Sequence, residues 1–251
     1  MLNRHGLSVL AFALISFTFS AESGAKDLTA TQILAKMDKT ISGYKDQYME
    51  NTMTVTNKKG SKKAYAFTIK QKGIKRLIRF TSGEVKGMAT LVLNPSRVFV
   101  YLPGYKKVRR VSANSMNQSF AGSDFSSADA SSATPWVKMC IAKLLRKDKD
   151  HWYVECKPKA EFHMPYSKLV MQVGKKTFFQ DGVDYYDNKG KKIKQMRSSD
   201  PKDYHGIKRN SVVVMTDLRT GHSTRLDIQD FKVNQGFPNS MFTVRQLQWG
   251  M

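Results

Sequence analysis

Acidic residues are scarce in this sequence. Asp and Glu together number 20 against 42 Lys and Arg, so the formal net charge is +22 at pH 7. Such a surplus favours an anionic partner, which could be nucleic acid, a membrane surface or acidic lipid. With 251 residues, of which 41% are hydrophobic, the chain can bury the core of one large domain or two small ones.

Long hydrophobic runs are absent beyond residue 20, which excludes a polytopic membrane protein. One apolar stretch, Leu7 to Phe19, follows the positive Arg4 and precedes small residues that end at Ser20 and Ala25. This pattern is typical of a cleaved Sec signal peptide, with an uncleaved anchor as the alternative. We therefore interpret residues 1–25 as a signal peptide removed after Ser20 or Ala25. An exported protein does not meet the bulk of cellular nucleic acid, so we expect no nucleic-acid partner.

Cysteine is rare, with Cys140 and Cys156 placed 16 positions apart. In an oxidising compartment an even number of cysteines favours a disulfide, which would add roughly 3 kcal/mol of stability for a loop of this size. Two reduced, buried cysteines are the alternative. Two cysteines and five scattered histidines lack the spacing of a metal-ligand cluster, so we expect no metal site.

Catalytic motifs are missing as well. The sequence holds no nucleophile elbow, no P-loop, no dinucleotide fingerprint and no His-Glu-x-x-His. The sparse carboxylates form no evident acid/base pair, and the histidines lie beside predicted turns or strand ends. We therefore predict that the protein is not an enzyme and has neither catalytic residues nor a cofactor.

What the sequence does contain is a long series of short strands. Residues 46–112 alternate apolar and polar positions in six predicted strands, separated by turn signals such as Lys72-Gly73 and Pro103-Gly104. Connections this short favour antiparallel neighbours. Strand patterns resume over residues 152–232, so we predict a mainly β chain with a few helices (α+β) and one curved sheet or barrel in a single domain over residues 26–251.

Two helices and a long loop interrupt the strands. Thr29 or Thr31 can cap a helix whose apolar face is formed by Ile33, Leu34, Met37, Ile41 and Tyr44. Residues 137–145 predict a second helix of two or three turns. Residues 113–135 are rich in Ser, Ala, Asn and Gly, with isolated aromatic residues among them. We predict that they form a loop with short helical turns draped over a cavity, and a disordered surface loop is the alternative.

Basic residues recur as doublets near predicted turns along the whole chain, among them Lys75/Arg76, Lys106/Lys107 and Arg109/Arg110. Charged side chains at these positions also hinder pairing between the exposed edges of sheets. The doublets are typical of a solvated rim rather than a nucleic-acid-binding groove. In an exported protein such a rim favours approach to an anionic membrane surface, where each basic residue contributes about 1 kcal/mol.

Three segments carry a resemblance to a known family: Gly87 to Pro95, Val100 to Ser112 and Gln118 to Phe125. They resemble the bacterial outer-membrane lipoprotein-sorting proteins, which are periplasmic carriers similar to LolA and LolB. The segment from Thr220 to Arg245 agrees, so the likeness extends from about residue 30 to 248. It implies a half-open antiparallel β-barrel of about eleven strands, with helices plugging the concave side.

The resemblance also implies a function. Such a carrier binds acyl chains of a lipoprotein or lipid in a hydrophobic cavity and moves them through the periplasm towards the outer membrane. The expected partners are these acyl chains, an anionic membrane surface and an inner-membrane transporter of the resistance-nodulation-division (RND) superfamily, and the expected state is a monomer. Two alternatives stay open: a periplasmic lipid sensor that regulates an envelope-stress pathway, and an adaptor of an efflux pump that binds no lipid.

Candidate site residues follow from this reading. The candidates for the acyl-chain cavity are apolar or aromatic side chains: Phe67, Ile69, Met88, Leu91, Phe99, Tyr101, Phe125, Trp136, Val213 and Met215. For each of them, ordinary packing in the core is the alternative. The candidates for a rim that meets headgroups or a membrane are the cations Lys106, Lys107, Arg109 and Arg110.

Overall fold

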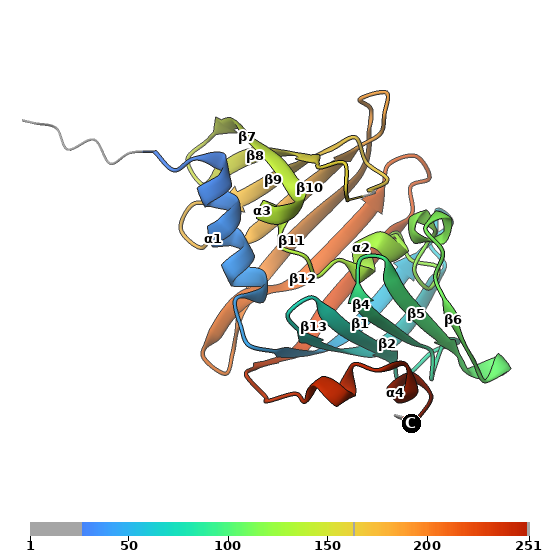
Figure 1. Cartoon of the computed structure of the whole chain (residues 1–251). Coiled ribbons are helices and arrows are strands. Elements are labelled where there is room, and N and C mark those ends of the chain that lie inside the picture. The colour runs from blue at the N-terminus through green and yellow to red at the C-terminus, as the bar shows by residue number, and fades with distance from the viewer. Residues whose placement is uncertain (1–26, 163, 250–251) are drawn as a thin grey trace, which may run out of the picture.

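The computed structural model describes residues 27–162 and 164–249 (Figure 1). The predicted signal peptide lies outside the described residues. The chain forms one open antiparallel sheet of thirteen strands in the order β6-β5-β4-β3-β2-β1-β13-β12-β11-β10-β9-β8-β7. The strands are β1 (Gln47–Thr56), β2 (Lys62–Lys72), β3 (Lys75–Phe80), β4 (Ala89–Asn94), β5 (Arg97–Leu102), β6 (Lys107–Arg110), β7 (Cys140–Lys147), β8 (His151–Pro158), β9 (Lys168–Gly174), β10 (Gln180–Tyr186), β11 (Lys192–Tyr204), β12 (Ile207–Asp217) and β13 (Ser223–Val233). The predicted class is confirmed, with thirteen strands in place of about eleven.

Short helices complete the described part of the chain. They are α1 (Ala30–Ser42), α2 (Ser127–Ser131), α3 (Trp136–Met139) and α4 (Val244–Trp249), with 3-10 turns η1 (Pro103–Tyr105), η2 (Asn114–Asn117) and η3 (Asn239–Met241). Within these residues no helix is both long and apolar enough to cross a membrane.

The strand order follows from hairpins. Strands β1 to β6 form one meander and β7 to β13 form another, and the pairing of β1 with β13 joins them. Strands β6 and β7 are consecutive in sequence but lie at the two opposite edges of the sheet. The segment that connects them must therefore cross the sheet from edge to edge.

Helix α1 begins where the sequence predicts. The Thr29 side chain accepts a hydrogen bond from the Gln32 backbone, and the Gln32 side chain accepts one from the Thr29 backbone, which completes a capping box. Ile33, Leu34 and Met37 are fully buried on one side of the helix. The helix ends at Ser42, so Tyr44 lies beyond it.

The sheet buries apolar side chains on both faces. We call the face covered by α1, α2 and α3 the inner face. There the buried side of α1 packs on β8 to β12, and Phe120 packs on β2 and β3. The other face, the outer face, carries α4, which covers β4, β5 and β6. Figure 1 shows α1 and α4 at opposite ends of the molecule. The prediction that helices cover one side therefore holds for α1 to α3 and not for α4.

The predicted helix over residues 137–145 is wrong. Only Trp136–Met139 is helical, and Cys140–Lys147 is the edge strand β7. Apolar residues at Val137, Ile141, Leu144 and Leu145 imitate helical spacing. Pairing with β8 decides the structure, because its register from Cys140↔Pro158 to Lys147↔Trp152 satisfies the backbone of β7.

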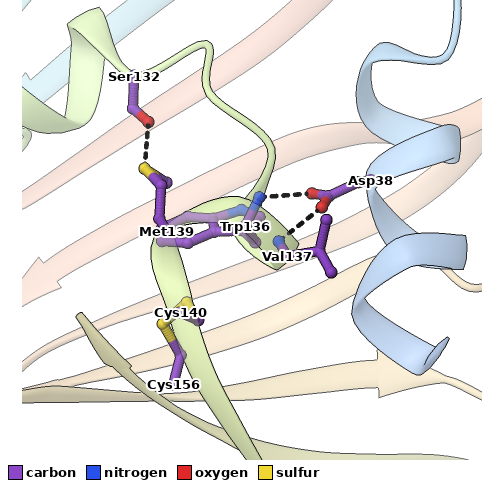
Figure 2. Close-up of a disulfide and its surroundings, with 7 residues drawn as sticks. All are labelled: Asp38, Ser132, Trp136, Val137, Met139, Cys140 and Cys156. Atoms are coloured by element: carbon purple, nitrogen blue, oxygen red, sulfur yellow. Dashed lines mark hydrogen bonds between the residues drawn. A yellow bond between two sulfur atoms is a disulfide. The ribbon is translucent and has the colours of Figure 1, made fainter. Parts of the chain in front are cut away.

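A disulfide fixes this edge strand. Cys140 and Cys156 are joined between β7 and β8 with Cα atoms 5.0 Å apart, and both are buried. The pairing favoured by the sequence is thus present (Figure 2). Because Cys140 directly follows α3, the bond also fixes the end of the segment that crosses the sheet.

Candidate ligand-binding cavity

The segment that connects the two sheet edges, residues 111–139, is the strap of this fold. It contains η2, α2 and α3 and lies over the inner face. Phe120 is buried with its ring centroid 5.7 Å from that of Phe80 on β3. The Ser126 and Asp129 side chains form a capping box that begins α2. The prediction of a loop with short helical turns over a cavity is confirmed, and the disordered alternative is wrong.

The larger cavity lies between the strap and the inner face of β4 and β5. Its volume is about 720 Å³, which falls within the range of small-molecule sites. Valines, methionines and small residues dominate its wall, and among the described residues the charged side chains that line it are Arg110 and Glu161. Its largest apolar contributors include Ile74, Val92, Val98, Met116, Met139 and Met164. An apolar wall rich in flexible methionines suits an apolar ligand of variable shape.

A smaller cavity of about 180 Å³ adjoins it. Both cavities are lined by Ala128, Ser132, Ala133, Thr134 and Met164 of the strap and the loop before β9. The smaller cavity is more polar, because its wall also includes side chains with charges or amides: Asp38, Gln71, Arg76, Asp129 and Gln180. The strap therefore lines both an apolar chamber and a polar one.

Arg76 reaches the polar chamber from β3. Its Nε and Nη2 atoms donate to Gln71 Oε1 at 3.0 and 2.7 Å, and Nη1 donates to the Ala130 carbonyl at 2.8 Å. Burial lowers the pKa of Arg76 to about 10, so the guanidinium is still protonated at neutral pH. Within the doublet Lys75/Arg76, Arg76 therefore does not belong to a solvated rim. Alternation along β3 turns this residue to the inner face, opposite Gln71 of β2.

Asp38 ties α1 to the strap. Its side chain is only 8% exposed, and its two oxygens accept from the backbone N–H groups of Trp136 at 3.0 Å and Val137 at 2.9 Å (Figure 2). Pro135 precedes α3 and makes no side-chain capping bond, so Asp38 supplies that cap from another helix. Burial raises the pKa of the Asp38 carboxyl, and the two backbone N–H groups partly oppose this shift.

We expect Asp38→Ala to lower the free energy of unfolding by about 2–6 kcal/mol, because it leaves two buried N–H groups without an acceptor at about 1–3 kcal/mol each. Asp38→Asn retains one carbonyl oxygen and should cost less. Urea unfolding at neutral pH measures both, and equal losses in the two variants would argue against this cap.

The same carboxyl predicts a pH dependence. Its pKa in the folded state lies above the ordinary 3.8, so the folded state binds the proton more tightly than the unfolded state. The contribution of Asp38 to stability is therefore fully present below pH 3.8 and is lost as pH rises through the raised pKa. The stability advantage of the wild type over Asp38→Asn should shrink over this interval. An advantage that grows with pH would contradict the direction of the shift.

Asp129 also stabilises the strap through hydrogen bonds. Its Oδ2 accepts from the Ser126 backbone N–H at 2.8 Å and from the Tyr166 hydroxyl at 2.9 Å. Burial raises the pKa of Tyr166 far above its usual range, so the phenol donates at any physiological pH. The Tyr166 ring packs edge-on to Tyr185 at 4.8 Å between centroids. Asp129 thereby anchors α2 to the half of the sheet that contains β10.

The predicted cavity residues fall into separate places. Phe125 and Trp136 line the smaller cavity. The others on the inner face belong to its packed clusters and line neither cavity: Phe67, Ile69 and Met88 in the first half of the sheet, and Val213 and Met215 near α1. The structure thus brings two of the ten candidates to a cavity wall.

Three predicted cavity residues lie on the outer face. Leu91, Phe99 and Tyr101 pack with Phe242 and Leu247 near α4. Antiparallel register explains the placement, since Leu91 pairs with Phe99 and Ala89 with Tyr101, and paired residues share a face. The cavity instead receives the alternate residues of the same strands, Val92 and Val98. Because β4 is apolar at successive positions, its sequence does not reveal which set faces the strap.

The predicted rim residues lie around the edge strand β6. Lys106, Lys107, Arg109 and Arg110 are exposed, and among the residues that the structure describes none of them forms an ion pair. Arg110 also lines the larger cavity and donates to the Ser96 carbonyl at 2.9 Å. Tyr105, at the tip of the β5–β6 hairpin, is 71% exposed. One of the four exposed cations of this edge, Arg110, therefore lines the apolar chamber.

Comparisons with known proteins agree with this architecture. A family model described as "Uncharacterized protein" matches residues 72–249, and no curated protein matches the sequence. Similar solved structures include a DUF1329 family protein from Desulfovibrio piger, with 24% identity and a TM-score of 0.80 over 87% of this chain and 98% of that one.

Two further structures are similar. A putative outer membrane lipoprotein-sorting protein domain from Vibrio parahaemolyticus has 24% identity and a TM-score of 0.77 over 87% of this chain and 98% of its own. A LolA superfamily protein from Nitrosomonas europaea has 21% identity and a TM-score of 0.74 over 88% and 100%. The predicted LolA-like fold is thereby confirmed.

Proposed function

The chain belongs to the family whose model matches residues 72–249, and from its LolA-like fold and its cavity we propose that it is a non-enzymatic carrier of acyl chains. The observation that carries the proposal is the apolar chamber of about 720 Å³, in which Arg110 and Glu161 are the charged lining residues within the described part of the chain. The acyl chain of a lipid or lipoprotein occupies this chamber between β4, β5 and the strap.

The energetics of burial support such a ligand. Each buried methylene contributes about 0.8 kcal/mol, so ten methylenes contribute about 8 kcal/mol. That free energy corresponds to a dissociation constant near 1 μM before the costs of ordering the chain. No covalent chemistry is needed for a carrier to bind and release its cargo on this scale.

The place of action in this proposal is the periplasm. The sequence pattern of residues 1–25 supports export, and the similar structure from Vibrio parahaemolyticus is described as a putative outer membrane lipoprotein-sorting protein domain. The protein would act as a monomer that receives its cargo at the inner membrane, with an RND-type transporter as the proposed donor, and moves it towards the outer membrane. The exposed cations around β6 would meet the anionic membrane surface during transfer.

A binding titration tests the proposed function. The protein is expressed from the complete sequence so that export can occur, and the exported protein is purified and titrated with a fluorescent long-chain fatty-acyl probe. We expect saturable binding with a dissociation constant in the micromolar range and displacement by unlabelled acyl lipid. Absence of saturable binding at millimolar probe would count against a carrier.

A further inference from the structure

The polar chamber contains a cation that no carboxylate neutralises. Among the residues that the structure describes, Arg76 donates only to the neutral oxygens of Gln71 and Ala130. These bonds use three of the five N–H groups of a guanidinium, which leaves two for another acceptor. Over the described parts of the chain, no Asp or Glu oxygen lies within ion-pair distance of Arg76.

The two carboxylates in the same wall already have donors. Both Asp38 oxygens accept from α3, and Asp129 Oδ2 accepts from Ser126 and Tyr166. Each of these carboxylates therefore accepts hydrogen bonds from groups other than Arg76. A half-buried cation with only neutral partners favours a ligand that brings negative charge to it.

A second side chain with an amide group lines the chamber from the other half of the sheet. Gln180 of β10 lines the smaller cavity, and its Nε2 is a buried amide donor without a hydrogen-bond partner among the described residues. Buried donors of this kind ordinarily have an acceptor. Arg76 on β3 and Gln180 on β10 thus line one space between the two halves of the sheet, and each has N–H groups without an acceptor among the described residues.

The chamber has the size of a small head group. Its volume of about 180 Å³ equals the liquid volume of about six water molecules. A carboxylate or a phosphate fits this space, and a long acyl chain does not. The wall shared with the apolar chamber consists largely of small side chains, at Ala128, Ser132, Ala133 and Thr134. The two chambers therefore adjoin at small side chains, where an elongated ligand has the most room to extend from one into the other.

We propose that the cargo is a single-chain amphiphile with an anionic end group, a carboxylate or a phosphate, which binds Arg76 and Gln180 in the polar chamber while its chain fills the apolar one. This inference rests on the proposed acyl-chain function and adds the charge and orientation of the ligand. It places the head group inside the molecule. The exposed Arg110 at the mouth of the larger cavity is the competing position for that group.

Matched ligands test the proposal. Dissociation constants of the exported protein are measured for hexadecanoate, hexadecyl phosphate and hexadecan-1-ol by displacement of a fluorescent acyl probe. We expect at least tenfold tighter binding of one anionic ligand than of the alcohol, which is the size of a charge-assisted hydrogen bond. The anion that binds more tightly identifies the end group as a carboxylate or a phosphate.

Variants locate the head group. Arg76→Gln should reduce the preference for the anion to near one and change alcohol binding by less than about threefold, whereas Arg76→Lys should retain part of the preference. Gln180→Leu should weaken anion binding alone, and it also tests the site if Arg76→Gln fails to fold. Arg225→Gln, at an exposed residue paired with Asp227 on β13, serves as the control.

The outcomes separate this inference from the proposed function. Equal binding of anion and alcohol by the wild type, or a preference unchanged in Arg76→Gln and Gln180→Leu, overturns the inference and leaves the carrier proposal standing. A preference lost in Arg110→Gln but kept in Arg76→Gln overturns it as well, because the head group then lies at the mouth. Failure to bind any of the three ligands contradicts both proposals.

Discussion

Replacing Ala133 with Trp is expected to abolish acyl-chain binding without unfolding the protein. Ala133 lines both chambers from the strap, so an indole at this position fills space that the ligand needs. Exclusion of only five methylenes removes about 4 kcal/mol of binding free energy, which weakens the dissociation constant by about 10³-fold. Because the new side chain enters an existing cavity, overpacking of the core should be small.

The measurement is a titration of Ala133→Trp with the fluorescent acyl probe, accompanied by thermal unfolding. Ala64→Trp is the matched control, because Ala64 is exposed on β2 and lines neither cavity. The control should bind the probe as the wild type does. A folded Ala133→Trp protein with unchanged affinity would show that the acyl chain lies elsewhere.

Neutralising the cationic edge is expected to weaken binding to anionic membranes by about 10²- to 10³-fold. The variant replaces Lys106, Lys107, Arg109 and Arg110 together with Gln. These four cations are exposed and have no acidic partner among the described residues. At about 1 kcal/mol each, their removal costs up to about 4 kcal/mol at an anionic surface.

Cosedimentation with phosphatidylglycerol vesicles measures this loss, with phosphatidylcholine vesicles as the uncharged reference. A second quadruple variant, with Gln at the exposed Lys189, Lys191, Lys202 and Lys208, removes the same charge from other turns. It should retain more of the binding. Equal losses in the two variants would assign membrane affinity to net charge alone and not to the edge beside the cavity.

Local sequence signals predicted much of the fold. The capping residue Thr29 and the spacing of Ile33, Leu34 and Met37 gave the start and the buried side of α1. Turn signals gave the hairpins, and the composition of residues 113–135 gave a loop with helical turns over a cavity. These features depend on interactions between residues close in sequence, which a single sequence displays directly.

The position of the cavity depends on pairing between distant residues. Residues 89–93 of β4 are apolar at almost every position, so periodicity does not choose between Leu91 and Val92 for the inner face. The choice is made by α4, which comes from the far end of the chain and covers Leu91 and Phe99. The same holds for Cys140–Lys147, where pairing with β8 overrides a helical spacing of apolar residues.

The position of Arg76 on the inner face could not be predicted from the sequence either. In sequence it belongs to a basic doublet beside the turn at Gly73, which is typical of an exposed position. In the structure β3 begins at Lys75, so alternation along this strand turns Arg76 inward to Gln71 and the strap. Its burial follows from the strap, whose path is set by the separation of β6 and β7 at opposite edges.

Native mass spectrometry of the protein tests the proposed carrier function most directly. The wild type and Ala133→Trp are purified from the cell envelope without detergent, so that a bound ligand is retained. The bound molecules are then extracted and identified. We predict an acyl-bearing molecule on the wild type and its loss from Ala133→Trp. A wild-type protein that carries no acyl-bearing molecule, or an Ala133→Trp protein that carries the same one, would contradict a carrier with its chain in this cavity.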